Sequence, residues 1–181
     1  MPLPATHIAL LRGINVGTAK RVPMADLRDL FAGLGYTNVA TLLNSGNVVF
    51  TGRRENSVRA EVRIEEAIVA RFGFPSRVTV ITAGELDAMV DENSLREAAT
   101  DPSRLLVAIL KTPPDRAKLL PLAERSWTPG LLALGARAAY LWCPDGMLES
   151  PLATAVSRAL GDATTMRNWA TILKLHALAA R

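Results

Sequence analysis

The sequence predicts an α+β protein built from two tandem ferredoxin-like (βαββαβ-type) units, the second a variant that ends in a C-terminal helix. The first observation is the order of patterns in the first half, where short apolar runs and amphipathic segments follow one another as β-α-β-β-α-β. The second is the polar run 91–102, after which a similar order begins again. The third is size: 181 residues with 49% hydrophobic content suffice for two small cores. We expect a first unit over 1–90, a linker over 91–103 and a second unit over 104–181.

In the first unit, residues that favour helix ends separate the apolar runs. Pro23 lies in the first turn of the first predicted helix, and Asn56 or Ser57 caps the second helix, which ends at Gly73. The sequence TAGE at 82–85 matches a capping box and opens a short third helix. The predicted strands cover 7–11, 38–43, 48–51 and 77–82, with the turn NSGN between the second and third.

The second half repeats this order in part. The expected elements are a strand at 104–111, a helix at 113–123, a hairpin of 131–134 with 138–143, and a helix from 150 to 161. The last segment, TTMRNWATILKLHALAAR, is interpreted as a helix that replaces the expected final strand. No repeat is visible at the level of residue identity, so the duplication rests on the order of elements alone.

Composition excludes several classes of protein. A net charge of +4 is compatible with anionic ligands, and no polybasic run demands nucleic acid. A single cysteine, Cys143, excludes an intrachain disulfide and a cysteine-rich zinc site; with only His7 and His176 besides, we expect no metal and no cofactor. No apolar stretch has the length of a membrane span and no signal peptide is recognisable, so we expect a cytoplasmic monomer or homodimer that makes no contact with a membrane.

Two turn-rich segments are expected to meet at one edge of the first unit. The first and second strands run in the same direction, and the third lies beside the first, so RGINVG at 12–17 and NSGN at 44–47 should lie close together. Arg12 can pair with an anion in bidentate fashion, and the glycines Gly13 and Gly17 can present backbone amides. The nearby helix that begins at Pro23 adds its positive dipole end. The same glycines are equally explained by turn geometry, and neither segment matches a nucleotide-binding motif.

Three blocks of the sequence carry a resemblance to a known family. IALLRGINVG, VPMADLRDLFAGLGYTNVATLLNSGNVVF and TTMRNWATILKL together resemble the family called domain of unknown function 1697. The resemblance implies an α+β architecture of ferredoxin-like units in bacterial cytoplasmic proteins, without an established activity. The chain departs from the family pattern at Thr18–Lys20, Asn44, Met166 and Ala170. The positions that the family marks are Arg12, Gly13, Asn15, Val16, Gly17, Ser45, Gly46, Asn47, Thr165, Arg167, Asn168 and Trp169.

Several functions fit these residues. The first is a binding module for a small phosphate-bearing or other anionic ligand, with the site residues Arg12, Gly13, Asn15, Gly17, Ser45, Gly46, Asn47, Arg167 and Asn168. The second is an enzyme of unknown reaction at the same edge, in which Arg12 stabilises developing negative charge; no general base is identifiable for it. The third is a structural or interaction protein in which these residues tie the units together. Nucleic-acid binding is less favoured, because aromatic residues make up only 5% of the chain and no strand carries paired aromatics.

Overall fold

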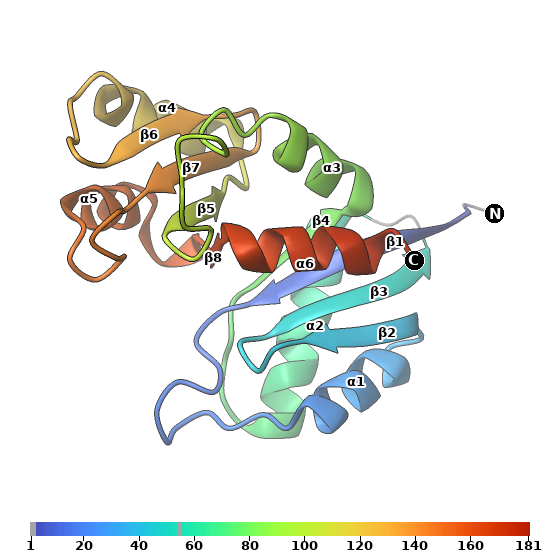
Figure 1. Cartoon of the computed structure of the whole chain (residues 1–181). Coiled ribbons are helices and arrows are strands. Elements are labelled where there is room, and N and C mark those ends of the chain that lie inside the picture. The colour runs from blue at the N-terminus through green and yellow to red at the C-terminus, as the bar shows by residue number, and fades with distance from the viewer. Residues whose placement is uncertain (1–2, 54–55) are drawn as a thin grey trace. The chain divides into compact units, whose positions relative to one another are not determined.

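The computed structural model describes residues 3–53 and 56–181, and these fold into two compact units (Figure 1). Unit 1 contains Met1–Leu86 together with Leu175–Arg181, and unit 2 contains Asp87–Lys174. Each unit has its own four-stranded antiparallel sheet.

Unit 1 is a ferredoxin-like βαββαβ unit, as the sequence predicts. Its sheet has the strand order β2-β3-β1-β4, so β1 lies between β3 and β4. β1 and β2 therefore run in the same direction, and both end at the edge of the sheet where β4 begins. The elements are β1 (Pro4–Leu11), α1 (Met24–Gly33), β2 (Thr37–Leu42), β3 (Asn47–Arg53), α2 (Ser57–Phe72) and β4 (Val78–Thr82), followed by α3 (Ala83–Asp91).

The helix ends of unit 1 follow local chemistry. The Asn56 side chain accepts a hydrogen bond from the Val58 N–H (2.8 Å) at the start of α2, and Gly73 ends that helix with a φ of +78°. At the start of α3, the Glu85 carboxylate accepts from the Thr82 N–H (2.8 Å) and the Thr82 hydroxyl accepts from the Glu85 N–H (3.2 Å). The capping box that TAGE predicts is therefore confirmed.

The core of unit 1 lies between one face of its sheet and the helices α1 and α2, which Figure 1 shows beside that sheet. Phe50 of β3 is at its centre, with ring centroids 5.2 Å from Phe31 and 4.4 Å from Tyr36. Apolar residues of both central strands bury against the two helices, and this burial is the main stabilising term. The buried residues include Ala9, Leu11, Leu27, Leu30, Val48, Ala60, Ile64, Ile68 and Val80.

Unit 2 repeats the fold of unit 1 with one correction to the sequence prediction. Its sheet has the order β6-β7-β5-β8, which matches β2-β3-β1-β4 position by position. The final strand, which we expected to be replaced by a helix, is present as β8 (Met166–Asn168) and pairs with β5. Three residues are too few to show an alternating pattern, so the helical period of the following residues dominated the prediction. The other elements are β5 (Leu105–Ile109), α4 (Pro113–Ala123), β6 (Leu131–Leu134), β7 (Ala138–Trp142), α5 (Pro151–Leu160), a 3-10 turn (Gly161–Ala163) and α6 (Trp169–Ala179).

Tyr140 on β7 is the largest fully buried side chain of the protein. Its hydroxyl donates a hydrogen bond to the Met89 carbonyl (2.6 Å), so the bond lies within unit 2 and ties the last residues of α3, which belong to that unit, to its sheet. Burial, with the charge of Glu92 as the smaller cause, raises the pKa of Tyr140 above its ordinary value. The folded unit therefore holds this phenol in its neutral form.

Replacing Tyr140 with phenylalanine is expected to lower the free energy of unfolding by about 1–2 kcal/mol at pH 7, because the Met89 carbonyl loses its donor. Since the folded pKa of Tyr140 is raised, its contribution is fully present below the unfolded value near pH 10 and is lost as pH rises above it. Urea unfolding at pH 7 and pH 11 measures this: the advantage of the wild type over the variant should shrink by about 1.4 kcal/mol. A difference that stays constant between the two pH values would contradict the burial of a neutral phenol.

Candidate functional site

The loop after β1, residues 12–23, is held in a fixed shape by one asparagine. The Asn15 side chain accepts from the Val22 N–H (2.8 Å) and donates to the Val22 carbonyl (3.0 Å), and the Asn15 N–H donates to the Lys20 carbonyl (3.0 Å). Gly13, Asn15, Gly17 and Lys20 all have positive φ values, between 52° and 73°. Positive φ is uncommon for residues other than glycine and concentrates at functional sites. The loop is therefore a closed, strained structure rather than an open connection.

The β2–β3 turn lies directly against this loop, as the sequence predicts. The Leu11 N–H donates to the Gly46 carbonyl (2.8 Å), and the Asn15 side chain also donates to the Asn44 carbonyl (2.7 Å). A Cβ atom at Gly46 would lie 2.7 Å from the Leu11 Cβ and 3.0 Å from the Ile14 Cδ1, so only glycine fits there without a shift. Segments about thirty residues apart thus share one edge of the sheet.

A third segment, residues 73–77 between α2 and β4, joins the same edge and was missed by the sequence reasoning. The Arg12 N–H donates to the Arg77 carbonyl (2.9 Å), and the Ser76 hydroxyl donates to the Arg12 carbonyl (2.8 Å). The signal was available, because β4 neighbours β1 in the ferredoxin-like order and must therefore begin where β1 ends. Leu11 indeed pairs with Val78, the first residue of β4.

These three segments, residues 12–23, 43–47 and 73–77, are called the cationic rim below. They contain Arg12, Lys20, Arg21 and Arg77, all exposed, and no aspartate, glutamate or histidine. Arg77 lies 3.6 Å from the Glu65 carboxylate of α2, and the Lys20 ammonium lies 5.9 Å from the Phe74 ring centroid. The residues of the three segments themselves thus carry charges of one sign, and Arg12, Lys20 and Arg21 outnumber the one carboxylate, Glu65, that pairs with Arg77; this favours an anion over a cation.

The backbone of the rim adds donors to these cations. Gly13 and Gly17 are exposed, and within the described chain their N–H groups make no hydrogen bond to protein. A side chain at either glycine would meet no other atom within 4 Å, so open space lies above both. Exposed amides beside arginine are suitable donors for a phosphate or carboxylate oxygen.

Two asparagines of the predicted site, Asn15 and Asn47, use their side-chain amides within the rim. Asn47 is fully buried, and its side-chain amide donates to the Leu42 carbonyl (2.8 Å) and the Ser45 hydroxyl (3.0 Å). Asn15 is half-buried and uses its amide within the loop, as described above. Both amides thus support the rim, Gly46 is buried beneath it, and Arg12 and Ser45 remain exposed.

Arg167 and Asn168 belong to unit 2, on β8. The Asn168 side chain accepts from the Thr171 N–H (2.8 Å) and so caps α6. Arg167 donates to the Met166 carbonyl (2.9 Å), and burial lowers the pKa of its guanidinium to about 10. Their place in the site stays a prediction, and the geometry described above is that of unit 1.

Unit 2 shows which parts of the rim the fold itself requires. The Leu110 N–H donates to the Arg137 carbonyl (2.8 Å), the counterpart of the bond from Leu11 to Gly46. The Ile109 N–H donates to the Thr165 carbonyl (3.0 Å), which joins the end of β5 to the residue before β8 as the Arg12 bond joins the end of β1 to the residue before β4. The strand-to-helix connection, however, takes only residues 110–112 in unit 2, against 12–23 in unit 1. The long loop is thus an addition to the fold, and additions of this kind commonly carry binding functions.

Among the described residues, no group of three or more histidine, cysteine or acidic side chains could hold a metal ion. Over the same residues, no helix combines the length and the apolar character that crossing a membrane requires. The single cysteine, Cys143, is buried in unit 2, and burial raises the pKa of its thiol. Cys143 therefore takes no part in the rim, which lies in unit 1.

Two ferredoxin-like units in one chain, with the cationic rim on the first, define an α+β protein built by duplication of one fold. The chain belongs to the family described as protein of unknown function (DUF1697), whose sequence model matches residues 5–140. A conserved bacterial protein, SP0830 from Streptococcus pneumoniae, has the same fold, with a TM-score of 0.74 and 19% sequence identity over 98% of this chain and 99% of that one. No curated protein matches the chain.

Proposed function

We propose that unit 1 binds a small anionic ligand, one that carries a phosphate or a carboxylate group, at the cationic rim. The observation that carries the proposal is the placement of Arg12, Lys20, Arg21 and Arg77, without an acidic residue, on segments held together by backbone hydrogen bonds. Because the second unit folds with a connection of three residues, the long loop serves something other than the fold.

The same geometry favours binding over catalysis. The rim carries no histidine and no carboxylate, so none of its side chains can act as a general base at neutral pH. Arginine and backbone amides stabilise negative charge, which is sufficient for recognition of an anion. The ligand is small, because the rim's aromatic contribution is limited to Phe74 and offers no stacking platform for a nucleic acid.

The test is a thermal unfolding series with inorganic phosphate, pyrophosphate and citrate, at constant ionic strength. At a hundred times its dissociation constant, a ligand of the folded state adds about 2.7 kcal/mol, which corresponds to a rise of roughly 5–10 °C for a chain of this size. We expect one of these anions to raise the midpoint of the wild type and to have little effect on Arg12→Ala.

Arg59→Ala is the matched control, since Arg59 is an exposed arginine in the first turn of α2, which follows β3 and so lies at the opposite end of the sheet. It should keep the response to the anion. If no anion shifts either protein and Arg12→Ala is several degrees less stable by itself, the rim is a structural element. A shift that grows with oligonucleotide length and falls steeply with salt would assign the rim to nucleic acid.

A further inference from the structure

Two apolar side chains lie in the open among the polar groups of the cationic rim. Val16 is 70% exposed and Leu43 is 51% exposed, so both present apolar surface to solvent instead of to the core of unit 1. Single exposed apolar residues are common on protein surfaces and need no explanation by themselves. These two differ in their position, because both lie beside the groups that the rim offers to an anion.

Val16 is the neighbour of an open backbone amide. It shares a peptide bond with Gly17, whose exposed N–H group makes no hydrogen bond to protein within the described chain. No atom lies within 4 Å of where a Cβ at Gly17 would be, so a ligand can approach this amide. An anion held by the Gly17 N–H therefore has the Val16 side chain beside it.

Leu43 is brought to the same place by the hydrogen bond between the two loops. The Asn15 side chain donates to the Asn44 carbonyl (2.7 Å), so Val16 and Leu43 each lie one residue from a partner of this bond. Leu43 has a φ of 58°, a value that is uncommon for a bulky side chain. Asparagine and glycine adopt this conformation with less strain, so the shape of the turn does not explain a leucine here.

The charge beside these side chains is positive. The loop 12–23 contains three cations and no acidic residue. Asp26, which follows the loop in the first turn of α1, pairs with Arg71 (3.3 Å), and Glu65 of α2 pairs with Arg77 (3.6 Å). The two carboxylates are thus engaged with arginines outside the loop, and the loop keeps its excess of positive charge.

The same positions in unit 2 show that the fold does not require exposed apolar residues there. The connection 110–112 begins with Leu110, which is 1% exposed, and continues with a lysine and a threonine. The turn between β6 and β7, residues 135–137, is Gly-Ala-Arg. Neither segment presents a large apolar side chain to solvent, so Val16 and Leu43 are particular to the rim of unit 1.

We propose that the anion bound at the cationic rim is amphiphilic: a phosphate or carboxylate that carries a short alkyl chain. The cations and open amides of the rim hold the head group, and the chain packs against Val16 and Leu43. This inference rests on the proposed function and adds to it the chemical class of the ligand.

The test compares ligands that share a head group and differ in chain length. The dissociation constants of methyl phosphate and hexyl phosphate, and of acetate and hexanoate, are measured by isothermal titration calorimetry at constant ionic strength. Each methylene group that is removed from water strengthens binding by a factor of about four. We expect the longer ligand of a pair to bind about fifteenfold more tightly than the shorter one, the effect of covering about two methylene groups.

The double variant Val16→Thr/Leu43→Asn replaces both apolar surfaces, and asparagine suits the φ of position 43. It should bind methyl phosphate or acetate as the wild type does and lose the preference for the longer chain. The matched control is Val58→Thr/Leu148→Asn, which exchanges two apolar residues outside the rim that are 62% and 91% exposed. The control should keep the preference.

Three results would overturn the proposal. If short and long chains bound equally and both lost affinity in Arg12→Ala, the rim would bind anions without regard to a chain, and the proposed function would stand alone. If none of the four ligands bound, the amphiphilic class would be wrong, and the series with phosphate, pyrophosphate and citrate would decide the proposed function separately. Binding to phosphatidylglycerol vesicles, with no response to the four ligands, would assign the rim to a membrane surface.

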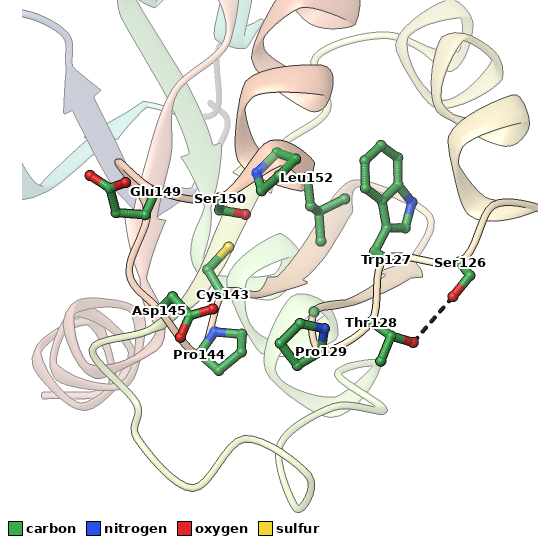
Figure 2. Close-up of a pocket in the computed structure, with 12 residues that line it drawn as sticks. Ser126, Trp127, Thr128, Pro129, Cys143, Pro144, Asp145, Glu149, Ser150 and Leu152 are labelled. Atoms are coloured by element: carbon green, nitrogen blue, oxygen red, sulfur yellow. Dashed lines mark hydrogen bonds between the residues drawn. The ribbon is translucent and has the colours of Figure 1, made fainter.

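A fourth result concerns another place where an alkyl chain can fit. Unit 2 has a cavity of about 460 Å³ between the loop before β6, the end of β7 and the start of α5, with Trp127 and Leu152 in its lining (Figure 2). If the preference for the longer chain survived in Val16→Thr/Leu43→Asn, the chain would bind away from the rim, as in this cavity, and the proposal would be overturned.

Discussion

Replacing Gly46 with alanine is expected to lower the midpoint of thermal unfolding by about 10 °C. The new Cβ would lie 2.7 Å from the Leu11 Cβ and 3.0–3.2 Å from two atoms of Ile14, all in buried side chains. Overpacking of this kind costs about 1–3 kcal/mol, and the φ of +86° adds about 1 kcal/mol for a residue with a Cβ. For a chain of this size each kcal/mol corresponds to roughly 2–4 °C. The measurement is a calorimetric scan of the variant beside the wild type.

Gly17→Ala is the matched control for this prediction. Gly17 also has a positive φ, +61°, but a Cβ there would meet nothing within 4 Å. Only the conformational term applies, and a shift of about 3 °C is expected. If both variants lost the same stability, the close contact between the β2–β3 turn and the loop after β1 would contribute nothing to the stability of the fold. A larger loss at Gly46 supports the contact as the anchor of the rim.

Replacing Asn15 with alanine is expected to lower the free energy of unfolding by about 3 kcal/mol. The side chain makes three hydrogen bonds, two with the backbone of Val22 and one to the Asn44 carbonyl, each contributing about 1 kcal/mol. Asparagine also tolerates the φ of 54° better than alanine does. Urea unfolding measures the loss. Since the rim is held together by these bonds, the proposed stabilisation by an anion should weaken in the same variant.

The control for Asn15 is Asn38→Ala. Asn38 has a similar φ, 51°, in the bulge of β2, yet its side chain makes a single long hydrogen bond, 3.3 Å to the Thr51 hydroxyl. The expected loss is therefore about 1 kcal/mol. Should the two variants prove equally destabilised, the hydrogen bonds of Asn15 would not hold the loop, and the rim would lack the rigidity on which binding depends.

Most of unit 1 could be predicted because capping residues close in the sequence determine where its helices begin and end. The cap at Asn56, the glycine at 73 and the capping box at 82–85 act over a few residues, so their effect is visible in the sequence. β8 was missed because a strand of three residues is defined by its partner, β5, and not by its own pattern. Local signals predict local structure, while pairing depends on residues distant in the chain.

The contact between the two segments of the candidate site was predictable, while the part that each side chain plays there was not. Strand order alone brought 12–17 beside 44–47, and the contacts of Leu11 and Asn15 confirm that placement. The sequence could not separate an amide that faces a ligand from one that supports a loop, and the amides of Asn15 and Asn47 are of the second kind.

The two units share their strand order and the backbone bonds at the end of the first strand, yet one has a loop of twelve residues where the other has three. Unit 2 therefore shows the fold of unit 1 without the long loop. Grafting the short connection of 110–112 in place of 12–23 should give a protein that keeps its sheets. The graft removes Arg12, Lys20 and Arg21 and adds one lysine, Lys111, so the rim loses two positive charges in all. Duplication of this kind lets one copy preserve the architecture while the other accumulates strained backbone and unbalanced charge.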